Sequence, residues 1–207
     1  MQRADIIRLI QVRIDEVAPS GVTPALDPID LGRELDLALD EFLRQAPREL
    51  LYPVGRAISI TGTDGLFALP DDFVRFLRFQ ADGWKNAVDS LLSVESPEAA
   101  LVRVSGSRYS ANRPRAIMVP IRAEGTAVKW GMEVYPQADS GLLFYVPQRQ
   151  AEDLPDSLID PLTVLAASRV FVILRQFQAS ELLRTRYVEM LRAMDIGVRM
   201  EIPFRGQ

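Results

Sequence analysis

The sequence of 207 residues contains no cysteine and no histidine. Without cysteine, the chain has no disulfide, no thiolate metal site and no cysteine nucleophile. Without histidine, it lacks the commonest general base, the commonest transition-metal ligand and the usual partner of a nucleophilic serine. Only carboxylates, lysine, arginine, tyrosine and hydroxyl groups remain for chemistry. We therefore expect no catalytic residue, no metal and no cofactor.

Long hydrophobic runs are also lacking. Six charged residues interrupt the first 17 positions, so we expect no signal peptide. The most apolar stretch, Leu162–Leu174, contains Arg169 and is shorter than the roughly 20 residues of a membrane span. We expect no membrane insertion but a buried helix. Its segment 162–168 is apolar nearly all round, so its cover comes either from its own chain or from a neighbouring subunit.

The overall composition is that of a folded protein: 48% of the residues are hydrophobic and 25% are charged. The length suits a single domain, with or without an insertion. The net charge of −4 argues weakly against a protein whose main task is to grip a nucleic-acid backbone.

Helical periodicity marks both ends of the chain. Apolar residues at helical spacing predict an amphipathic helix over 3–18. Asp27 or Asp30 can cap a second helix that ends before Pro47. The helical period returns at residue 156 and continues through a last helix that ends near 194.

The middle of the chain has residue patterns typical of β-strands. Alternation over 57–61 and again over 66–69, with Thr63-Asp64-Gly65 between them, predicts a β-hairpin. Ser96 can cap a short helix over 97–104. Further strands are expected near these ranges: 74–80, 116–122, 126–135 and 141–147.

Together these patterns predict an α+β fold. We expect a mostly helical bundle formed by the N- and C-terminal helices, within one domain over 1–194. Its helical parts would be 1–55 and 156–194, and an antiparallel β-rich module would be inserted over 56–150.

A run of arginines forms the sharpest charge asymmetry. The segment Arg103–Arg122 holds five arginines and no acidic residue. Arginine recognises phosphate and carboxylate well, so Arg108, Arg113 and Arg115 are candidate contacts to phosphate or to an acidic partner. The alternative is a solvated loop, which is the usual fate of a charge run.

The C-terminal residues 195–207 form the second candidate site. Val198, Met200, Ile202 and Phe204 occupy alternate positions, which in an extended chain would form one apolar edge. Such an edge suits strand addition or groove binding, so we expect a docking tail that is ordered by another chain.

Carboxylates offer the weakest candidate. Asp71 and Asp72 follow Pro70, which favours a helix start that accepts negative charge rather than an acid–base pair. An enzyme would have to assemble from Asp71 or Asp72 with Tyr109 and Lys129, and their spacing matches no catalytic motif. A carboxylate-dependent enzyme and a nucleic-acid-binding module using Arg103–Arg122 stay as alternatives.

Several short sequence segments, spread over most of the chain, resemble head-to-tail adaptor proteins of short-tailed and crAss-like bacteriophages. They begin with the isoleucine-rich first helix. The others are Asp36–Leu43, Ala68–Arg75, Asp160–Leu162 with Ala166 and Ala167, and Leu183–Tyr187.

The resemblance implies a structural virion protein at the head–tail interface, made in the host cytoplasm. Adaptors of this kind form a ring, usually twelve-fold, beneath the portal protein, with tail or further ring proteins below. DNA passes through the channel without sequence-specific binding. In such rings the C-terminal tail often reaches the portal, a role that would fall to residues 195–207.

Overall fold

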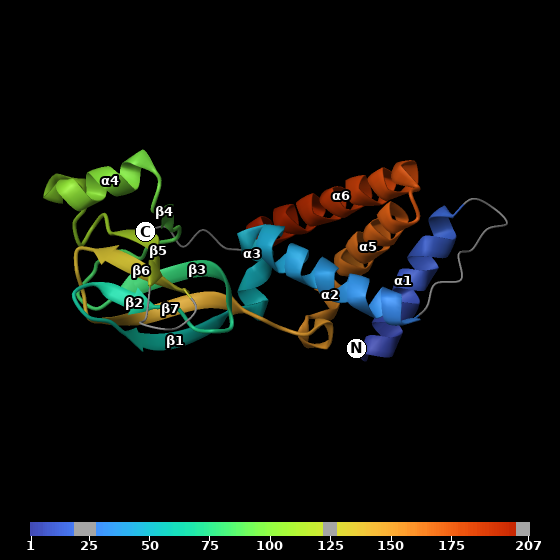
Figure 1. The fold of residues 1–207 in the computed structure, drawn as a ribbon, viewed down its shortest axis with the longest axis horizontal. Coiled ribbons are helices and arrows are strands. Elements are labelled where there is room, and N and C mark those ends of the chain that lie inside the picture. The colour runs from blue at the N-terminus through green and yellow to red at the C-terminus, as the bar shows by residue number, and fades with distance from the viewer. Residues whose placement is uncertain (19–27, 122–127, 202–207) are drawn as a thin grey trace. The chain divides into compact units, whose positions relative to one another are not determined.

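The structure is a computed structural model that describes residues 1–18, 28–121 and 128–201. The chain divides into two compact units (Figure 1). The first, here the helical unit, comprises Met1–Val54 and Arg149–Gln207. The second, here the sheet unit, comprises Gly55–Gln148.

The helical unit contains the helices that periodicity predicts at both ends of the chain. The expected first, second and last helices are confirmed, while Asp30 lies inside the second helix and the alternative cap Asp27 lies outside the described residues. The elements are α1 (Arg3–Val17), α2 (Pro28–Gln45), α3 (Arg48–Leu51), η1 (Tyr52–Val54), η3 (Ala151–Asp153), α5 (Asp156–Ile173) and α6 (Phe177–Glu201).

Helix α5 lies in the middle of this unit and contacts α1, α2 and α6 (Figure 1). Its side chains are buried on all sides from Leu158 to Phe171, except at Asp160 and Arg169. The chain itself therefore covers this apolar stretch. The sequence alone allowed cover either by the chain itself or by a neighbouring subunit. Among the described residues, no helix is both long and apolar enough to cross a membrane.

Arg169 is the basic residue of this apolar helix, and two glutamates of α2 bind it. Its Nε lies 3.0 Å from Glu34 Oε2, and its Nη1 lies 2.9 Å from Glu41 Oε2. Glu34 is buried, so its carboxylate depends on Arg169 for a counter-charge. These pairs set the position of α2 along α5.

Replacing Arg169 by Met should lower the free energy of unfolding by about 3 kcal/mol, because the buried Glu34 loses its counter-charge and Glu41 keeps only Arg184. Urea unfolding followed by far-UV circular dichroism measures this. The matched control is Arg44→Met, which breaks an exposed pair with Asp40 and should cost about 0.5 kcal/mol or less. Equal losses in the two variants would contradict a structural role for the Arg169 pairs.

The sheet unit contains two sheets. In the first, β7 (Ser140–Pro147) lies between β1 (Arg56–Thr61) and β3 (Phe73–Ala81), and both pairings are antiparallel. The second has the order β2-β6-β5-β4, in which β5 and β4 run parallel. Its strands are β2 (Leu66–Ala68), β6 (Lys129–Tyr135), β5 (Arg115–Ile121) and β4 (Leu92–Ser93).

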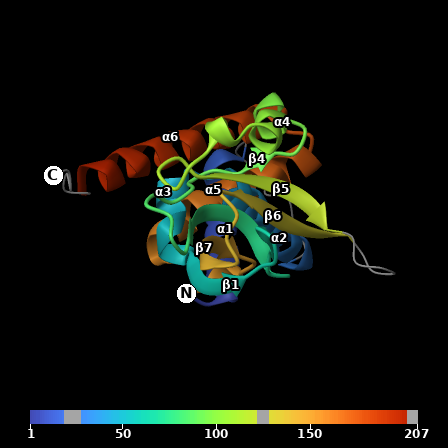
Figure 2. The same cartoon turned by 90° about the vertical axis from the view of Figure 1, so that its left-hand side faces the viewer.

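The two sheets share one core, and α4 (Pro97–Val104) covers the second sheet (Figure 2). Alternation along β5 produces this layering: Ala116 faces the core shared with the first sheet, whereas Ile117 packs with Val102 of α4. Ser96 caps α4 as the sequence predicts, since its Oγ accepts a hydrogen bond from Ala99 N at 3.2 Å.

The expected hairpin over 57–61 and 66–69 is wrong, although both strands and the turn exist. Asp64 and Gly65 have positive φ, and Thr63 and Leu66 exchange backbone hydrogen bonds across them. Beyond this bridge the strands separate, because β1 pairs with β7 while β2 pairs with β6. A local turn signal cannot reveal partners that lie more than sixty residues further along the chain.

The predicted architecture also needs correction. The chain is α+β, but among the described residues its six α-helices are spread along the chain and its seven strands form two sheets. It is therefore not a helical bundle with an inserted antiparallel module. Helix α4 lies between β4 and β5 in the sequence and makes that strand pairing parallel, because the chain must cross over before it returns.

Candidate functional site

The arginine run of the sequence folds into the wall of a pocket in the sheet unit. After α4 the chain forms the short helix η2 (Gly106–Arg108) and then a tight turn into β5. Ser110 and Arg113 close that turn with a pair of backbone hydrogen bonds, and Ser110 Oγ accepts a third bond from Arg113 N at 3.2 Å. This short turn keeps the arginines close together.

The pocket has a volume of about 540 Å³. The three arginines that the sequence singles out all line it, and so does one acidic residue. The lining residues with polar side chains are Glu98, Arg108, Tyr109, Ser110, Arg113 and Arg115. Three arginines against one glutamate give the lining a net charge of +2. We call this cavity the arginine pocket.

The arginines of the run differ in their pairing. Arg115 Nε lies 3.3 Å from Glu98 Oε1, and Arg103 Nη2 lies 2.6 Å from Glu133 Oε2. Arg108 and Arg113 form no ion pair with any residue that the structure describes, and both are exposed. Arg122 lies outside the described residues. Within the described part of the run, the charge without an ion pair is therefore concentrated at the arginine pocket.

A contact between two tyrosine rings supports one side of the arginine pocket. The rings of Tyr109 and Tyr135 are tilted against each other, with centroids 5.1 Å apart. The Tyr135 hydroxyl donates a hydrogen bond to Glu133, which Arg103 also binds. Burial, followed by this hydrogen bond, raises the pKa of Tyr135 to about 12. Tyr135, which Glu133 fixes in position, thus holds the ring of Tyr109 in place.

A second cavity of about 460 Å³ adjoins the arginine pocket. The two share Glu98, Arg113 and Arg115. The second cavity adds Asp89, which pairs with Arg78 at 3.9 Å, and the amides Asn86 and Asn112, so the charged side chains that line it sum to zero. One end of the combined concavity is therefore cationic, and the other is neutral and rich in hydrogen-bonding groups.

The raised pKa of Tyr135 predicts a loss of stability in alkali. A folded-state pKa above that of the unfolded chain, about 10, favours the folded state fully below pH 10 and progressively less as the pH approaches 12. Tyr135→Phe should lose less stability than the wild type when urea unfolding is compared at pH 8 and pH 11. An identical pH dependence in the two proteins would show that Tyr135 does not titrate as its surroundings require.

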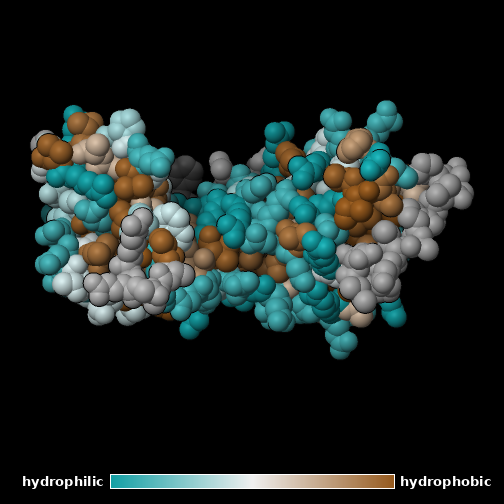
Figure 3. All heavy atoms as spheres, viewed as in Figure 1, coloured by the Kyte–Doolittle hydropathy of each residue, from teal (hydrophilic) through white to brown (hydrophobic). Residues whose placement is uncertain are grey.

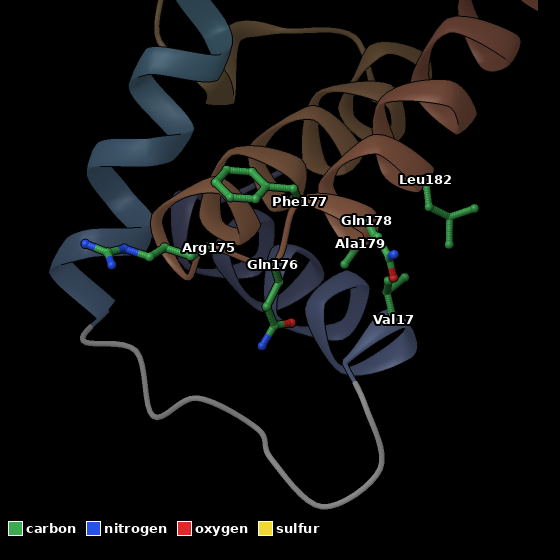
Figure 4. A pocket seen from close by; sticks show the side chains of 7 residues that line it. All are labelled: Val17, Arg175, Gln176, Phe177, Gln178, Ala179 and Leu182. Atoms are coloured by element: carbon green, nitrogen blue, oxygen red, sulfur yellow. The ribbon is translucent and has the colours of Figure 1, made fainter.

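The helical unit carries a different feature, an exposed apolar surface at the turn between α5 and α6 (Figure 3). Ile173 is 59% exposed, Phe177 65% and Leu182 60%, and Val172 is exposed beside them. A cavity of about 640 Å³ opens here, where Val17 at the end of α1 lies beside Gln178 and Ala179 of α6 (Figure 4). We call Val172, Ile173, Phe177 and Leu182 the apolar turn surface.

Phe177 and Leu182 are large apolar residues of α6 that the core of the helical unit does not take up. Leu183 is buried in the helical unit, and its neighbour Leu182 points to solvent. Adjacent leucines on a helix lie about 100° apart, so a single buried face cannot take both. That doublet is the sequence signal for the exposed surface.

The expected extended tail is also wrong over the residues that the structure describes. Helix α6 continues to Glu201, so Val198 and Met200 lie in its last turns rather than on a strand-like edge. Ile202 and Phe204 lie outside the described residues. Helical hydrogen bonding continues because extending an existing helix fixes one residue for each bond gained.

Of the enzyme candidates, the structure brings Asp71 and Lys129 together, and Tyr109 is not part of that contact. Asp71 Oδ1 accepts a bond from Lys129 Nζ at 2.8 Å, and Asp72 Oδ1 accepts one from Tyr145 at 2.8 Å. Tyr109 lies instead at the arginine pocket. The helix start expected at Asp71 is wrong, because this turn leads into β3. The described residues hold no cluster of three acidic side chains suited to a metal ion.

Comparison with protein-family models and with curated proteins gave no match for the chain.

Proposed function

We propose that this chain is a structural subunit that assembles with copies of itself, as a head-to-tail adaptor of a bacteriophage virion. In this role the subunits form a ring beneath the portal protein and link it to tail proteins along the DNA channel. The protein acts by contact rather than by chemistry. The apolar turn surface is the observation that carries the proposal.

The apolar turn surface suits contact with another protein. Large apolar side chains at neighbouring positions stay in water there, and burying each one contributes about 1.5–3 kcal/mol. The cavity beside Val17 adds a recess that a protruding side chain of a second subunit can enter. Phe177 and Leu182 both line this recess, and exposed apolar groups around a recess are typical of interaction sites.

The sequence segments that resemble adaptor proteins also support the proposed function. Those of the helical unit lie on α1, α2, α5 and α6, and the other three helices each pack against α5. Phe42 of α2 meets Tyr187 of α6 edge to face, with ring centroids 6.4 Å apart. The shared segments thus describe how these helices pack.

The charge of the chain is compatible with a channel through which DNA moves. A protein that neutralises many phosphates releases counterions and holds DNA tightly. A subunit with a net charge of −4 has little overall attraction for the duplex. DNA can then pass without being retained.

The test replaces Phe177 and Leu182 together by Asp. Both side chains are exposed, so the monomer should fold with an unchanged melting temperature. Self-association should weaken about a hundredfold or more, because two apolar contacts are lost and two charges are introduced. Sedimentation velocity and native mass measurement, on the chain alone and with a candidate portal protein, report the assembly state.

Val104→Asp is the matched control, since Val104 is an 88% exposed apolar residue of the sheet unit. This control should assemble as the wild type does. A doubly substituted protein that forms the same oligomers as the wild type would refute the role of the apolar turn surface. A wild type that stays monomeric both alone and with the portal would refute the proposed function.

A further inference from the structure

The arginine pocket and the cavity beside it are not needed for an assembly role that rests on the helical unit. They carry their own chemistry, which depends on three arginines, one tyrosine and two asparagines of the sheet unit. We propose that this paired concavity binds a small phosphorylated molecule of the sugar-phosphate or mononucleotide class. Its phosphate would occupy the arginine pocket.

Charge points to phosphate as the anchoring group. A phosphomonoester carries about −1.5 to −2 charges at pH 7 and presents three acceptor oxygens. The lining charge of +2 balances this anion. Arg108 and Arg113 have guanidinium groups without a described ionic partner, and a guanidinium can donate two parallel hydrogen bonds to phosphate oxygens.

Short-range donors add to the charge at the same place. Ser110 lines the arginine pocket between the two arginines, and its hydroxyl can donate to an oxygen while it accepts from Arg113 N. Tyr109 offers a second hydroxyl, and its ring is already packed against Tyr135. A pocket whose wall is held in place loses less entropy when a ligand binds.

The adjoining cavity favours a small ligand over a nucleic-acid backbone. A phosphodiester chain would carry negative charge through both cavities, and in the second it would meet Asp89, which does not line the first. A sugar or a nucleoside instead offers neutral hydroxyl and ring nitrogen groups there, which Asn86 and Asn112 can meet with hydrogen bonds. Each cavity has the size of a small-molecule site.

The experiment titrates the full chain with ribose 5-phosphate, adenosine 5′-monophosphate, ribose and inorganic phosphate, using calorimetry at fixed ionic strength. Binding of the two phosphorylated sugars is expected, with no heat from ribose and weaker binding of inorganic phosphate. The double change Arg108→Ser, Arg113→Ser should weaken binding about tenfold or more, since two charged donors are lost.

Arg8→Ser with Arg33→Ser is the matched control, because it removes the same charge from exposed arginines of α1 and α2. Affinity should be unchanged in this control. An equal loss in both double variants would reduce the effect to net charge and overturn the proposal, as would a wild type that binds neither phosphorylated sugar at millimolar concentration.

The same titration is also carried out with single-stranded DNA. Binding of an oligonucleotide that the pocket variant loses, with a steep salt dependence and no competition from ribose 5-phosphate, would assign the arginines to a nucleic-acid backbone and overturn the small-ligand assignment. The readout is independent of assembly, because the apolar turn surface lies on the other unit. A negative result for ligand binding therefore does not refute the proposed assembly function. A negative result for assembly likewise does not refute ligand binding.

Discussion

The helical unit depends on covering α5. This helix is apolar around nearly its whole circumference, so helices must pack against it on several sides to keep it from water. The small residues Ala166, Ala167 and Ser168 let those helices approach closely, and all three are buried. Arg169 sets the register of α2 on α5, because its guanidinium binds Glu34 and Glu41, which lie about two turns apart on α2. Packing supplies the stability here, and the ion pairs make the arrangement specific.

The cover over α5 stops where the helix ends, and the apolar turn surface begins there. Val172 and Ile173 are the last residues of α5, and the chain then reverses through Arg175, which has a positive φ. Such a backbone conformation costs free energy for a residue other than glycine, so the surrounding packing must hold the turn in place. The reversal leaves Phe177 facing solvent. An assembly contact at this position would complete the burial that the chain begins by itself.

The sheet unit separates its own core from its candidate ligand site. The core lies between the two sheets, whereas the arginine pocket forms at the outer layer, where α4, η2 and the start of β5 meet. Substitutions at Arg108 or Arg113 therefore do not disturb the core. The apolar turn surface and the arginine pocket also belong to different units, so contact and ligand binding can be changed independently.

Local patterns in the sequence determined the helices at both ends, the Ser96 cap, most strands and the clustering of Arg108, Arg113 and Arg115. Each of these depends on residues within a few positions of one another, so periodicity and hydrogen-bonding chemistry specify them directly. Only the tertiary structure decided which strands pair, which of Leu182 and Leu183 is buried, and that Glu98 and Glu133 bind two of the arginines. It also decided that α6 continues through Val198, where apolar alternation suggested an extended chain. The physical reason is the same in each case: a short pattern is compatible with several partners, and burial against distant parts of the chain selects one of them.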